Sequence, residues 1–222
     1  MHRLSTRIGI GFQNPTTQLS QVAGTVFEEV AFGPMNLGTE RDEIVERVWA
    51  ALDALRISAL AERDPRRLSG GQQQLVAMAG LLAMRPAHLV LDEPTAQLDP
   101  AGTRLVAEAI ARLAAEGASI LVAEQKTELL RDVASRVVAL DHGRVALDGP
   151  AQDILADPAL AALGVAPPAD VRLARAAEAA GWKAGDTGSK LYPREYQKLA
   201  GPWKGGIDPA EKVLLSHRAL RA

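Results

Sequence analysis

Two short stretches of this sequence combine residue types that can bind and cleave a phosphate. In the first, an apolar run ends in two adjacent acids, Asp92 and Glu93. An acid at the end of a strand can hold Mg²⁺, directly or through water, and its neighbour can polarise an attacking water. In the second, Ser69, Gly70 and Gly71 stand where a helix could begin. Small residues there let backbone N–H groups point at an anion, helped by the helix dipole and the Ser69 hydroxyl.

Each stretch also has an ordinary structural interpretation. A lone pair of acids after a strand is most often the start of a polar turn, and a Ser-Gly-Gly turn often just precedes a helix. Taken alone, each stretch therefore favours the ordinary interpretation. What changes this is their order and spacing along the chain, because a long ordered string of motifs seldom occurs by chance.

The elements that would position these residues alternate between strand and helix. Apolar runs predict buried strands, while apolar faces and capping residues such as Thr39 and Asp99 mark the helices. Strands are expected at 8–12, 88–92 and 119–123, and helices at about 40–55, from 70 to just before 86, and from 99 to about 117. This order predicts right-handed crossovers and a parallel α/β sheet. A Gly-containing turn at 141–143 predicts a hairpin over 137–147.

The carboxyl ends of the predicted strands gather the polar residues. Asp92 and Glu93 follow the second strand, and Gln125 follows the third. Ligands of open α/β sheets bind at this end of the strands. We therefore expect the site to lie at this edge of the sheet.

Composition excludes several classes of protein. The 222 residues are 47% apolar, enough for one sizeable core. There is no Cys, so disulfides are excluded and a reducing, cytosolic setting is expected. No apolar run approaches the ~20 residues that span a bilayer, so membrane attachment would depend on another chain. The net charge of -2 gives no electrostatic case for nucleic-acid binding.

The ordered string LSGGQQQ, then LVLDEPT, then LDP resembles the ATP-binding-cassette (ABC) ATPase family. The resemblance covers about residues 8–175. It implies an α/β fold with a RecA-like parallel-sheet lobe and an α-helical signature lobe at about 14–85. The cassette domain would cover 1–167. Residues 168–222, richer in basic and aromatic residues, would be a C-terminal extension of unknown role.

The resemblance also implies roles for particular residues, with ATP and Mg²⁺ as cofactors. Glu93 would be the catalytic carboxylate and Asp92 a metal ligand at the end of the Walker B strand. Gln13 would be the Q-loop glutamine, which contacts Mg²⁺ or the attacking water. Gln125 stands where the family places a His that contacts the γ-phosphate. The nucleotide would further contact two loops. One is the signature loop, formed by Ser69, Gly70, Gly71 and Gln72, and the other is the D-loop (96–99), through Asp99.

Further stretches, among them GFQNPTTQLS and TVFEEVAFGPMNLG, resemble the ATPase subunits of energy-coupling-factor importers of cobalt, nickel and vitamins. The resemblance implies a dimer with a second ABC ATPase subunit. It also implies contact with a transmembrane permease through the region Gln13–Pro34. The chain would then be peripheral, on the cytoplasmic face of the cell membrane.

The sequence departs from the family at the phosphate-binding loop, which is called Walker A. No G-x-x-x-x-G-K-[ST] pattern precedes Gln13 or occurs elsewhere, and Gly185–Lys190 has its composition but not its spacing. Gln125 can donate an N–H but cannot carry a proton. Three alternatives remain open: an ATPase completed by residues upstream of this sequence, a non-catalytic donor of the signature loop to a Walker A-bearing partner, and a truncated gene fragment.

Overall fold

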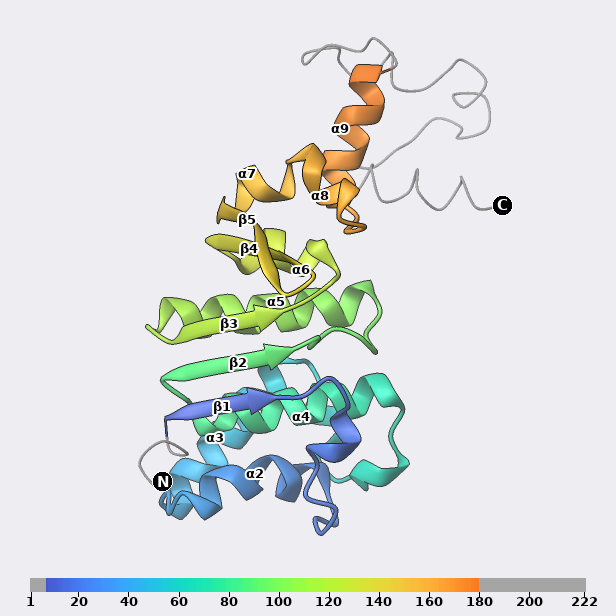
Figure 1. Ribbon diagram of the computed structural model, residues 1–222. Coiled ribbons are helices and arrows are strands. Elements are labelled where there is room, and N and C mark those ends of the chain that lie inside the picture. The colour runs from blue at the N-terminus through green and yellow to red at the C-terminus, as the bar shows by residue number, and fades with distance from the viewer. Residues whose placement is uncertain (1–6, 180–222) are drawn as a thin grey trace, which may run out of the picture. The chain divides into compact units, whose positions relative to one another are not determined.

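Three parallel strands form the sheet that carries the site (Figure 1). The computed structural model describes residues 7–179 of the chain. The strands are β1 (Ile8–Gly11), β2 (His88–Asp92) and β3 (Ser119–Ala123), in the order β1-β2-β3. Both neighbouring pairs run parallel, as predicted, because helical segments connect the end of each strand to the start of the next.

The chain between β1 and β2 is helical. Its longer helices are α2 (Val26–Asn36), α3 (Arg41–Ala54) and α4 (Gly70–Met84), with short 3-10 turns η1 (Pro15–Thr17), η2 (Ser58–Leu60) and η3 (Pro65–Arg67). α2 begins with a capping box, in which Thr25 and Glu28 satisfy each other's backbone N–H groups. The predicted helix after the glycines is α4, and it ends before Pro86 as expected.

The predicted capping of α3 by Thr39 is wrong. Glu40 is the N-cap residue, and it makes no side-chain capping hydrogen bond. Thr39 lies one residue outside the helix, and its backbone N–H donates to Pro34 O at 3.1 Å in the turn after α2. The turn, not the helix, therefore fixes Thr39.

After β2 the chain forms α5 (Pro100–Ala115), β3, α6 (Thr127–Val133) and a hairpin. The hairpin strands are β4 (Arg136–Asp141) and β5 (Arg144–Pro150), and short helices α7 (Ala151–Leu155) and α8 (Pro158–Ala162) follow. Positive φ angles at His142 (46°) and Gly143 (76°) suit the tight turn that was predicted there.

The chain divides into two compact units between Leu173 and Ala174, within α9 (Ala169–Ala179). Gly185–Lys190, in the second unit, lies outside the described residues. The assignment of 168–222 as a separate extension stays a prediction. None of the described helices is long and apolar enough to cross a lipid bilayer.

One face of the sheet carries the core. Leu89 and Leu91 point into it and are 1% exposed. They belong to one apolar cluster with residues of α4 and α5, which cover this face (Figure 1). Burial of this apolar surface is the main source of the fold's stability.

The opposite face of the sheet is open within residues 7–179. Ile10, Val90 and Leu121 form one row across it, in register through the backbone pairing. Ile10 is 48% exposed and Leu121 is 67% exposed. Parallel sheets are normally covered on both faces, so this apolar row calls for a further layer.

Candidate functional site

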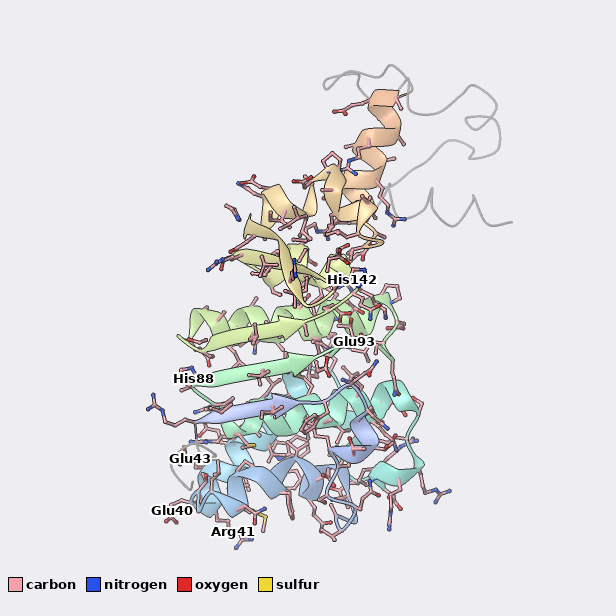
Figure 2. All side chains as sticks on the ribbon, viewed as in Figure 1. Glu40, Arg41, Glu43, His88, Glu93 and His142 are labelled. Carbon is pink, nitrogen blue, oxygen red and sulfur yellow. The ribbon has the colours of Figure 1, made fainter. Side chains whose placement is uncertain are left out.

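The carboxyl ends of the three strands converge on Glu93. Gln13 follows β1, Glu93 follows β2 directly, and Gln125 follows β3. Figure 2 shows Glu93 just beyond the end of β2. Parallel strands bring their carboxyl ends to one edge, so residues far apart in sequence meet there.

Two glutamine amides hold the Glu93 carboxylate. Gln13 Nε2 donates to Glu93 Oε2, and Gln125 Nε2 donates to Glu93 Oε1, both at 2.7 Å. Each carboxylate oxygen therefore has one amide donor, which fixes the plane of the group. The arrangement suits an acid that must accept a proton in one orientation.

The backbone at Glu93 is in the left-handed region, with φ 44°. A residue with a side chain costs of order 1 kcal/mol or more in this conformation. A backbone hydrogen bond from Glu93 N to Ala123 O, 2.8 Å long, helps to hold it. The left-handed turn directs the chain out of β2 and places the carboxylate between the two glutamines.

Asp92 is the last residue of β2 and is exposed at the same edge. With its Nε2 bound to Glu93, Gln13 retains its amide oxygen as a possible ligand. A carboxylate and an amide oxygen are hard donors, and Mg²⁺ needs only one or two such protein ligands beside water and phosphate oxygens. These two residues fit that requirement. Within residues 7–179 no group of three or more His, Cys, Asp or Glu could enclose a metal by itself.

The predicted anion-binding turn forms the start of α4. Ser69 is the N-cap residue, and its Oγ accepts from Gln72 N at 3.4 Å. Gln72 Oε1 in turn accepts from Ser69 N at 3.1 Å. Since the first N–H groups of a helix lack intrahelical partners, the exposed N–H groups of this turn are suited to an anion.

Gly70 and Gly71 both lie close to Gln97, which the sequence did not reveal. A Cβ on Gly70 would displace the flexible Gln97 side-chain amide, and a Cβ on Gly71 would stand 3.1 Å from the Gln97 backbone oxygen, a tight contact. The turn after Glu93 therefore packs directly on the start of α4 in the same chain. Gln74 adds a second tie, because its buried amide donates to Pro94 O at 3.0 Å.

Asp99 forms the predicted helix cap. Its Oδ1 accepts from Gly102 N at 2.7 Å, and Pro100 occupies the first turn of α5. The structure thus places Asp99 at the end of the segment that follows Glu93, with its carboxylate partly engaged by the helix.

Replacement of Asp99 by Ala is expected to lower the free energy of unfolding by about 1 kcal/mol, the usual value of a side-chain N-cap. Chemical denaturation of the purified chain measures this as a lower midpoint at unchanged slope. The Asp99→Ser variant retains a capping oxygen and is the control. Equal stability of the Ala variant and the wild type would show that α5 does not depend on this cap.

Sequence reasoning missed Thr95, Glu124 and Lys126. Glu124 and Lys126 flank Gln125 and hydrogen-bond the segment directly after Glu93. No pattern in a single sequence predicts these contacts, because they join two loops that only the parallel sheet brings together.

Shortly before α4 in the chain, the Arg66 guanidinium donates a hydrogen bond to the Asp64 carboxylate and lowers the pKa of that carboxyl.

Known proteins are similar to this chain in sequence and in fold. The family model described as ABC transporter matches residues 1–96. An energy-coupling factor transporter ATP-binding protein, EcfA of Methanothermobacter thermautotrophicus, is 40% identical over 155 residues, which are 70% of this chain and 49% of that protein.

Two solved structures share the fold. The first is cbiO1 from Clostridium perfringens, part of the ABC transporter complex cbiONQ. It superposes with a TM-score of 0.62 at 33% identity, over 78% of this chain and 69% of that one. A dimeric ATP-binding cassette, MJ0796 bound to ADP and Pi, has a TM-score of 0.60 at 24% identity, over 68% of this chain and 65% of that one.

This α/β sheet, with a helical segment between its first two strands, is therefore an ATP-binding cassette fold, which it shares with cbiO1 and MJ0796. The chain belongs to the ABC transporter family. It spans 30% to 60% of the length of the first curated relatives that it matches.

Proposed function

We propose that this chain is the ATP-hydrolysing subunit of an ABC importer of the energy-coupling-factor type, which takes up a metal ion or a vitamin. One observation carries the proposal. Glu93, the residue after the β2 strand, is held between Gln13 and Gln125 at the edge of the sheet where ligands of this fold class bind.

The chain's own residues have distinct tasks in this reaction. Glu93 accepts the proton of the attacking water, and the two glutamine amides orient its carboxylate. Asp92 and Gln13 Oε1 would hold Mg²⁺, which neutralises charge on the phosphates. The Gln125 amide donates a hydrogen bond but cannot accept a proton from water, so proton transfer depends on Glu93 alone.

A second ATP-binding subunit completes the site. In this arrangement Ser69, Gly70 and Gly71 close over the nucleotide that the partner holds. The sequence pattern of the Gly-rich loop that wraps the β- and γ-phosphates, G-x-x-x-x-G-K-[ST], does not occur in the 222 residues, and another segment or chain would provide it. The apolar row at Ile10 and Leu121 supports this, because a further layer of structure is needed there.

The permease would contact the region Gln13–Pro34. A cleft of about 230 Å³ lies between β1, α2 and α4, and Gln18, Leu19, Phe32 and Gly33 of this region line it. Phe32 is 43% exposed, so its ring is available for a contact in an assembly. This contact would hold the chain on the cytoplasmic face of the membrane.

The choice of importer class is supported by the names of two relatives. EcfA is named as an energy-coupling factor transporter subunit, and cbiO1 as part of the complex cbiONQ. The substrate would be selected by the membrane subunits, which this chain would serve by supplying energy.

A second candidate function is that of a signature-loop donor without catalysis of its own. Gln125 favours it, since it stands where the family has a residue able to carry a proton. In that case the partner's site alone would hydrolyse ATP, and Glu93 would be dispensable.

The proposed function predicts a difference between the chain alone and its complex. Purified alone, the 222 residues should show no micromolar ATP binding by calorimetry and no phosphate release. Combined with a Walker A-bearing ATP-binding subunit and the permease, they should support ATP hydrolysis. Micromolar binding by the chain alone, with turnover lost on Glu93→Gln, would contradict the need for another phosphate-binding segment. An assembled complex without hydrolysis would contradict the function itself.

A further inference from the structure

Gln125 is flanked by two residues that are anchored to the same short segment. Before it in sequence, Glu124 Oε2 accepts from Thr95 Oγ1 at 2.6 Å. After it, Lys126 Nζ donates to Thr95 O at 2.9 Å and lies 3.5 Å from Ala96 O. The loop that carries Gln125 is therefore fixed on both sides to residues that closely follow Glu93.

The anchor is buried and fully hydrogen-bonded at Thr95 Oγ1. Thr95 is fully buried, with 0% of its surface exposed, so its hydroxyl has no water to replace Glu124. Lys126 brings a charged donor to backbone carbonyls, and such hydrogen bonds are stronger than neutral ones. The other oxygen of Glu124 accepts from the backbone N–H groups of Gln125 and Lys126, at 2.9 and 3.0 Å. The Glu124 carboxylate thus stabilises the turn through one oxygen and bonds it to Thr95 through the other.

We propose that Lys126 and Glu124 are positioning residues, which keep the Gln125 amide on the Glu93 carboxylate by fastening the Gln125 loop to Thr95 and Ala96. Lys126 acts from the far side of Gln125 and does not itself touch Glu93 in the structure. Its loss would leave the Gln125 loop tied by Glu124 alone. The consequence for turnover rests on the proposed function, but the local anchoring does not.

Hydrogen exchange on the intact chain tests the anchoring without ATP. The Lys126→Met variant keeps the length of the stem and removes the donor. The amides of Ala96 and Leu98 donate hydrogen bonds within the turn after Glu93. We expect them to exchange about tenfold faster, because that turn loses its hydrogen bonds from Lys126 Nζ. Lys126→Arg should restore slow exchange. Arg104→Met, which removes an exposed cation from α5, is the matched control and should change nothing there.

Unchanged exchange at Ala96 and Leu98 in Lys126→Met would overturn the proposal. So would an equal rise in Arg104→Met, or a rise spread evenly over the helices, since either would show a general loss of stability instead of a local anchor.

ATPase kinetics of the complex provide the second measurement. Lys126→Met should lower kcat about fivefold to tenfold and leave KM for ATP unchanged, and Lys126→Arg should recover most of kcat. Faster exchange with an unchanged kcat would mean that the anchor does not position Gln125 for catalysis, and the proposal would fail. If the wild-type complex hydrolyses no ATP, the proposed function fails, while the exchange measurement still decides whether Lys126 anchors the turn.

Discussion

Replacing Glu93 by Gln is expected to reduce ATP hydrolysis by the assembled complex by a factor of about 10² to 10⁴, the usual contribution of a positioned general base. The amide cannot take a proton from water. The fold should persist, since Gln has nearly the same volume and one of the two neighbouring amides can turn its oxygen toward it. Steady-state phosphate release measures the loss, and unfolding by denaturant checks that stability is retained.

The matched control for this variant is Glu108→Gln. Glu108 lies on α5 with an exposed carboxylate, so the same change of charge occurs away from the site. Its turnover should equal that of the wild type. Turnover within threefold of the wild type in Glu93→Gln would instead support the signature-loop donor, in which the partner's site hydrolyses ATP without Glu93.

Gly71→Asp is expected to abolish ATPase activity of the complex while the chain still folds. A carboxylate in the first turn of α4 interacts favourably with the helix dipole, so the helix tolerates it. The same charge would repel a phosphate bound at this turn, by about 4 kcal/mol for charges 4 Å apart at an effective dielectric constant of 20. That energy corresponds to a decrease of about 10³ in the equilibrium constant for closing this turn over the bound nucleotide.

Gly71→Asn separates charge from size. Asn has the same shape without the charge, and its Cβ meets the same obstacle, the Gln97 backbone oxygen at 3.1 Å. We expect Gly71→Asn to retain at least tenfold more activity than Gly71→Asp. Full activity in Gly71→Asp would show that the turn before α4 does not face the nucleotide. Equal losses in both variants would assign the effect to steric displacement of Gln97.

Much of the fold could be predicted because its signals are local. The apolar run at 88–92 is β2, and Asp99 followed by Pro100 begins α5. The parallel arrangement follows from the helices between strands. The prediction for Thr39 is wrong because Thr occurs both as a helix N-cap and in turns. Here the Thr39 backbone N–H donates to Pro34 O in the turn after α2, and Glu40 is the N-cap residue.

The sequence proposes the members of the candidate site but not the contacts between them. The resemblance supplied Gln13, Glu93 and Gln125 but assigned them to metal, water and phosphate. Their mutual hydrogen bonds join residues 80 and 32 positions apart, which no local pattern encodes. The packing of Gln97 on Gly70 and the anchoring by Lys126 likewise depend on how two loops meet, so only the three-dimensional arrangement reveals them.

The left-handed backbone at position 93 sets stability against function. Glycine would adopt φ 44° without strain, which would relieve roughly 1 kcal/mol, but it would also remove the carboxylate that accepts from Gln13 and Gln125. Backbone strain and the two amide hydrogen bonds therefore act in opposite directions on stability at this one residue. An acid at position 93 keeps its carboxylate in place at the cost of a strained backbone.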